Sequence, residues 1–238
     1  MKLLVWIDDD AHVMLPVVQN WFPTLWDEEI ACKILFFGDA YQDYGGSKRS
    51  QADADNFTRD MNELYEDYLR TRKRKGLALP PKDLCTEDST EVVPELTCDA
   101  LIEKLAELKD NDSNQVGVAL DVVLRRGDYE RLAPPIDQTT KEALKKPDEI
   151  LSMDIYHALT RKPRPGEEEH QRYQCAVYST FTFSETFKGN WTRIYKEKHG
   201  DDAPAIIPRT FLNTRPIDRG ILDEFLGLFR EEVPENEN

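Results

Sequence analysis

LLVWIDDD, residues 3–10, is the stretch that decides the fold. Five consecutive apolar residues suit a strand that is covered on both faces, as in the interior of a parallel sheet. The expected strand, residues 2–8, ends in the aspartate triplet 8–10, and crowded carboxylates repel unless a cation or a proton neutralises them. A second apolar run, residues 116–120, ends in the same way on Asp121. One such aspartate would simply cap a helix, but two strand ends favour a site for Mg²⁺, which prefers oxygen ligands.

Composition and charge limit the classes of function. The chain has 238 residues, 39% of them hydrophobic, which is enough for a proper core. Its net charge of −15 argues against a broad nucleic-acid footprint, because phosphate binding needs clustered Lys and Arg. One basic run, residues 70–75, could meet a phosphate or an acidic partner, but is predicted to be a solvated helix end. No apolar stretch reaches the roughly 18 residues of a membrane span, and the N-terminal run is too short for a signal peptide, so we expect a cytoplasmic protein.

Cysteine and histidine spacing indicates no zinc or redox motif. No C-x-x-C pair, H-x-x-x-H pair or Cys/His cluster occurs, and the cysteines are predicted to be buried or incidental thiols. The residues in question are Cys32, Cys85, Cys98, Cys175, His12, His157, His170 and His199.

Strand-like and helix-like segments alternate along the chain. We expect strands over residues 2–8, 32–37, 116–121, 175–178 and somewhere in 205–213. We expect helices over about 11–22, 53–74, 98–109, 148–160, after Ser184, and over 218–231, with Pro16 kinking or shortening the first. The pattern predicts one α/β domain, residues 1–238, with a doubly wound, mainly parallel five-stranded sheet and helices on both faces. Residues 45–97 and 125–172 interrupt the alternation and are predicted to be helical or loop insertions.

In such sheets, ligands bind beyond the carboxyl ends of the strands. Asp8, Asp9, Asp121 and Ser179 would all lie at that edge. Along the chain, the polar residues that follow the strands then come in the order acid pair, single acid, hydroxyl and basic residue.

With this order, the chain resembles the response-regulator receiver domain, a five-stranded flavodoxin-like fold. VWIDDD, residues 5–10, resembles the family's first strand with its acidic pair. LDVVL, residues 120–124, resembles the third strand with its phospho-accepting aspartate, and Asp128 falls where the next loop commonly carries another Asp. VYST, residues 177–180, resembles the hydroxyl ending of the fourth strand, and TRPID, residues 214–218, the Thr-Lys-Pro-aromatic-Asp turn into the last helix.

The resemblance implies a role for each matching residue. Asp8 and Asp9 would bind Mg²⁺ together with the backbone carbonyl of Val123. Asp121 would accept a phosphoryl group from a partner, since a carboxylate beside a metal can attack phosphorus. Ser179 would hydrogen-bond the new phosphoryl oxygen and so couple modification to a loop shift. Asp10 would be a bystander.

The basic position departs from the family pattern. Arg215 stands where receivers use Lys, and a guanidinium differs from an ammonium in reach and geometry. Arg209 takes that place if the last strand has another register. The aromatic switch position falls on Leu212 in the direct register and on Phe211 one residue away.

Three functions follow. The first is a stand-alone receiver-like regulator in which Mg²⁺-dependent phosphorylation of Asp121 switches contact with a protein partner, either a kinase or a regulated effector. The second is a pseudo-receiver that binds a partner without phosphoryl chemistry. The third is a haloacid-dehalogenase-like phosphohydrolase that uses Asp8 and Asp10. Against the third, Ala11-His12 follows instead of the usual Thr or Val pattern, and no Asp-Asp pair ends a later strand.

Overall fold

The structure is a computed structural model with a central parallel sheet. It describes residues 1–8, 11–37, 51–80, 84–86, 88–93, 98–110, 115–122, 124, 151–161, 172–179, 185–208, 212 and 217–229. Its strands are β1 (Lys2–Asp8), β2 (Ile30–Phe37), β3 (Thr90–Val93), β4 (Gln115–Asp121), β5 (Gln174–Ser179) and β6 (Ile206–Pro208). Its helices are α1 (Ala11–Asp27), α2 (Gln51–Arg74), α3 (Cys98–Asp110), α6 (Leu151–Thr160), α7 (Glu185–His199) and α9 (Arg219–Gly227).

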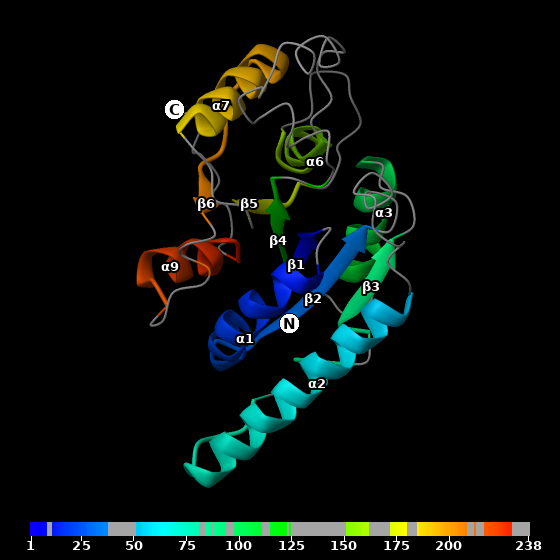
Figure 1. The fold of residues 1–238 in the computed structure, drawn as a ribbon, viewed down its shortest axis with the longest axis vertical. Coiled ribbons are helices and arrows are strands. Elements are labelled where there is room, and N and C mark those ends of the chain that lie inside the picture. The colour runs from blue at the N-terminus through cyan, green and yellow to red at the C-terminus, as the bar shows by residue number, and fades with distance from the viewer. Residues whose placement is uncertain are drawn as a thin grey trace.

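The sheet is doubly wound, as predicted. Its strand order is β3-β2-β1-β4-β5-β6, and each neighbouring pair is parallel. The chain therefore steps outward from β1 to β3, returns to β4 beside β1, and steps outward in the other direction (Figure 1). Without β3, the remaining order is that of flavodoxin-like folds.

Helices cover both faces of the sheet. On one face, the Trp6 ring of β1 contacts Phe22 of α1 and Phe225 of α9, with ring centroids 6.1 and 5.2 Å away. α2 packs against α1 on this side, where the Trp26 and Tyr65 rings are 4.7 Å apart. On the other face, a smaller apolar cluster joins α6 and α7 to β5. Side chains alternate between faces along a strand, which gives the sheet two apolar sides.

Among the residues that the structure describes, the sheet has six strands, whereas the sequence predicted five. The added strand is β3, which lies at the edge beside β2 and falls within the segment predicted to be an insertion. It has four residues, all of them partly exposed, so neither length nor apolar alternation marks it in the sequence. Its place depends on long-range contacts such as the hydrogen bond from Ile34 N to Ser89 O, 2.8 Å.

Helix α1 is longer than predicted. It runs through Pro16 and Pro23 and ends at Asp27, so Pro16 does not shorten it. A proline inside a helix removes a backbone hydrogen bond, but the apolar face of α1 is extensively buried. The buried side chains are Met14, Val17, Val18, Trp21, Phe22, Leu25 and Trp26. Burial on this scale outweighs the local cost of a proline.

The longest described helix, α2, has 24 residues and is rich in charged side chains. None of the described helices combines the length and the apolar character that a membrane crossing requires.

Candidate functional site

Asp8 and Asp121 end two neighbouring strands. Ile7 of β1 lies opposite Leu120 of β4 in the parallel register. Asp8 and Asp121 are the next residues on their strands, so they end the two strands at the same level. Neighbouring strands are about 4.8 Å apart. The strand order reverses between β1 and β4, which is where doubly wound sheets bind ligands. Both aspartates have 0% exposure and lie at the carboxyl ends of their strands.

Ser179 belongs to the same edge of the sheet. It is the last residue of β5, the strand on the other side of β4, and it is fully buried. Tyr178, just before it, lies opposite Asp121 in the register. Three of the predicted site residues, Asp8, Asp121 and Ser179, therefore occur at the carboxyl ends of three adjacent strands.

The remaining predicted site residues lie outside the described residues. They are Asp9, Asp10, Val123, Asp128, Arg209, Phe211 and Arg215. Leu212, the predicted switch position in the direct register, is described and fully buried. Its backbone carbonyl accepts a hydrogen bond from the Trp21 indole N–H, 2.9 Å, so this position is tied to α1.

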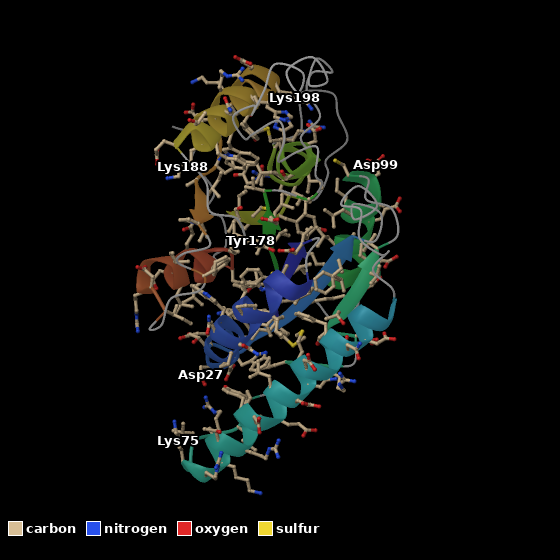
Figure 2. The ribbon with its side chains drawn as sticks, in the orientation of Figure 1. Asp27, Lys75, Asp99, Tyr178, Lys188 and Lys198 are labelled. Atoms are coloured by element: carbon tan, nitrogen blue, oxygen red, sulfur yellow. The ribbon has the colours of Figure 1, made fainter. Side chains whose placement is uncertain are left out.

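Tyr178 is a site residue that the sequence prediction missed. Its hydroxyl donates to Asp8 Oδ2 at 2.7 Å and has a second acceptor, the Ile7 carbonyl, at 3.2 Å. The Tyr178 ring meets the Trp6 ring edge-on, with centroids 5.2 Å apart. Tyr178 lies in the interior of the molecule (Figure 2). A tyrosine on a buried strand usually needs a partner for its hydroxyl. That requirement was the available signal, but the sequence alone does not say where the partner lies.

The backbone just after Asp121 is fixed from two sides. Val122 N donates to the Tyr178 carbonyl, 2.8 Å, and the Val122 carbonyl accepts from the buried Ser152 hydroxyl, 2.5 Å. Ser152 belongs to α6 and was not expected to contribute to the site. The backbone that follows Asp121 is therefore held by both β5 and α6.

The donor chemistry fits a hard cation. Two buried carboxylates at adjacent strand ends need compensating positive charge or hydrogen-bond donors, and carboxylate oxygens are ligands that Mg²⁺ accepts. Within the described ranges, no three His, Cys, Asp or Glu side chains form a group that could hold a metal ion. Asp8 and Asp121 would supply two ligands, and the third predicted carboxylate, Asp9, lies outside those ranges.

Comparison of the chain with protein-family models, curated proteins and solved structures found no match in any of the three. The site must therefore be interpreted from its own residues. The six-strand order is also used by dinucleotide-binding sheets, in which a glycine-rich turn after the first strand approaches the pyrophosphate. In this chain the sequence after β1 is Asp9-Asp10-Ala11-His12, without glycine. The carboxyl ends of β1 and β4 with Asp8 and Asp121, which we name the acidic edge, therefore do not fit that ligand.

Proposed function

We propose that the chain is a receiver-like regulatory protein in which Asp121 accepts a phosphoryl group in the presence of Mg²⁺. The observation that carries the proposal is the pair of buried carboxylates, Asp8 and Asp121, at the ends of neighbouring parallel strands, with the Ser179 hydroxyl on the next strand. This is the arrangement of acid, acceptor and hydroxyl that the receiver resemblance implies. The proposed output is a changed contact with a protein partner.

The chemistry uses Asp121 as the nucleophile. One Asp121 oxygen forms a bond to the phosphorus of the donor while the bond from phosphorus to the leaving oxygen breaks, and the leaving group keeps the electron pair. Mg²⁺, when bound, would neutralise charge on the phosphoryl oxygens. Asp8 would help to hold the ion, and Ser179 would donate its hydroxyl hydrogen to a phosphoryl oxygen. Tyr178 would orient Asp8 through their hydrogen bond.

The proposal is tested by intact-mass measurement after incubation with acetyl phosphate and Mg²⁺. We expect the wild-type chain to gain one phosphoryl group, and we expect no gain with a chelator or in Asp121→Asn. Asp99→Asn is a matched control, because Asp99 is an exposed aspartate at the start of α3. Absence of the adduct in the wild-type chain, or equal labelling of Asp121→Asn, contradicts the proposal.

A pseudo-receiver is the second candidate, and a specific observation favours it. Asp8, Asp121 and Ser179 are all fully buried, and the Tyr178 hydroxyl already occupies Asp8 Oδ2. A phosphoryl donor can reach Asp121 only if this edge opens. If Mg²⁺ changes the fluorescence of the wild-type chain but not of Trp6→Phe, while no adduct forms, the acidic edge is a binding site without phosphoryl chemistry.

A further inference from the structure

Helix α2 extends beyond the part of the molecule that it packs against. Its 24 residues span about 36 Å. Its buried side chains are Phe57, Met61 and Tyr65, at intervals of four, and the last of them precedes the helix end by more than two turns. From residue 73 to residue 79 each position is exposed. The C-terminal end of α2 projects away from the sheet, with Lys75 at its far end (Figures 1 and 2).

The projecting end, which we name the α2 tip (residues 70–79), has a defined backbone. Gly76, with φ 67°, and Leu77 close the helix by hydrogen bonds from Gly76 N to Lys73 O, 3.2 Å, and from Leu77 N to Arg72 O, 3.0 Å. This pair is the Schellman motif, in which glycine takes the left-handed conformation. Arg72 also donates from Nε to the Ala78 carbonyl, 2.7 Å, and contacts Asp27 of α1. The chain after the helix is therefore held in place.

The α2 tip presents two apolar side chains to solvent. Leu77 is 51% exposed and Leu79 is 57% exposed, and together with Met1 they make up the exposed large hydrophobic side chains of the described residues. In a Schellman motif the residue after the glycine often packs back on the helix. Leu77 has the cation Arg72 at the corresponding helix position and stays exposed. A single exposed leucine is ordinary, but here two of the three occur within one short segment.

The same segment is strongly basic in an acidic chain. Residues 70–79 contain five Arg or Lys and no Asp or Glu, whereas the whole chain has a net charge of −15. Arg70 pairs with Asp67 at 2.8 Å and Arg72 pairs with Asp27. For Lys73, Arg74 and Lys75 no ion pair exists with an acidic side chain of the described ranges.

We propose that the α2 tip is a docking surface for an acidic protein segment that carries an apolar side chain. The three cations would attract the acidic groups, and Leu77 and Leu79 would pack on the apolar side chain. Because the rest of the molecule repels an acidic partner, electrostatic complementarity would orient the encounter toward this end. Nucleic acid fits less well, since phosphate binding makes no use of the leucines.

The test measures binding of labelled synthetic peptides to the full chain by fluorescence anisotropy. One peptide is rich in glutamate and contains leucines; the second has serine in place of each leucine; a single-stranded oligothymidylate is the third probe. We expect the leucine-containing peptide to bind best and its binding to weaken at high salt. Two variants, K73Q/R74Q/K75Q and L77S/L79S, should each weaken that binding by about tenfold or more, the loss typical of central interface residues.

A matched control removes three cations elsewhere. K188Q/R193Q/K196Q changes exposed side chains of α7, which have 47%, 56% and 64% side-chain exposure, and should bind the peptide as the wild type does. Circular dichroism checks that each variant is folded. Equal peptide binding by the wild type and by both tip variants overturns the proposal. The proposal is also overturned if the serine peptide or the oligothymidylate binds as tightly as the leucine-containing peptide, because the leucines of the peptide would then have no role in binding.

Discussion

At the scale of single residues, the carboxylates of the site were predictable and their partner was not. Asp8 and Asp121 each end a run of buried residues, and an acid in that place is visible in the sequence. Tyr178 lies within a buried strand, where an aromatic residue is ordinarily core. Its hydrogen-bond partner Asp8 lies 170 positions earlier in the chain, and only the register of β1, β4 and β5 brings the two together.

Gly117 in β4 allows the end of α9 to approach the sheet. A Cβ built on this residue would lie 2.9 Å from Leu228 Cβ and 3.3 Å from Phe229 Cζ. Since Leu228 Cβ is fixed to the backbone, Gly117→Ala must displace the residues that follow α9. We expect a loss of about 1–3 kcal/mol in the free energy of unfolding, as for other overpacked cores, measured by urea denaturation.

The control for Gly117 is another glycine in a regular element. Gly189 lies in α7 and is exposed, and a Cβ added to it would have no neighbouring atom within 4 Å. Gly189→Ala should raise the free energy of unfolding by about 0.5–1 kcal/mol, because alanine favours the helix. If Gly117→Ala is as stable as the wild type, the residues that follow α9 do not pack as closely on Gly117 as the structure shows.

At the scale of elements, the long buried strands followed from the sequence, while β3 did not. β1 and β4 have six consecutive buried residues each, and such runs are recognisable. β3 has four partly exposed residues, and ion pairs add to its backbone pairing with β2. Glu91 of β3 pairs with Lys33 of β2 at 3.1 Å and with Lys104 of α3 at 2.9 Å. These partners come from separate elements, so no local pattern reveals them.

Removing the charge of Glu91 should weaken the attachment of β3. Lys33 has 11% side-chain exposure, so in Glu91→Gln its ammonium group would be nearly buried without this counter-charge. Breaking a fully buried pair costs more, but Glu91 is a third exposed, so we expect a loss of about 1–2 kcal/mol in urea denaturation at neutral pH. Glu107→Gln is the control: Glu107 is 65% exposed and 3.5 Å from Lys104, and its loss should change stability by less than about 0.5 kcal/mol.

The same pair gives a signed pH dependence. Burial would raise the pKa of Glu91, but the hydrogen bonds and charges of Lys104 and Lys33 outweigh it and hold the pKa below 4.5. A carboxyl whose pKa is lower in the folded state stabilises the fold above its unfolded pKa and loses that effect as the pH falls through its folded pKa. The stability difference between the wild type and Glu91→Gln should therefore narrow below about pH 4.5. If the stability difference between the wild type and Glu91→Gln stays constant below pH 4.5, the ion pairs of Glu91 with Lys33 and Lys104 are contradicted.

At the scale of the whole molecule, the buried apolar side chains form two clusters of very different size. The main core surrounds β1 and includes most of the buried apolar side chains. The second core is small and contains Val122, Met153, Val177, Phe187, Trp191 and Tyr195. Helix α7 buries three of these, and β6 pairs with β5 through three residues. Regions with few buried contacts open at lower free energy than the rest of a fold.

We therefore expect α7 and β6 to open before β1 and β4 do. In hydrogen–deuterium exchange followed by mass spectrometry, amides of β1 and β4 should exchange most slowly and those of α7 and β6 faster. Trp191 connects α7 to the segment that leads into β6, because its indole N–H donates to the Pro204 carbonyl at 3.2 Å. Trp191→Phe should speed exchange in α7 and β6 and leave β1 unchanged, whereas Trp21→Phe in the main core should speed exchange throughout. Uniform protection across the sheet would mean that the two cores unfold as one unit. The opening that a phosphoryl donor needs to reach Asp121 would then require unfolding of the whole domain.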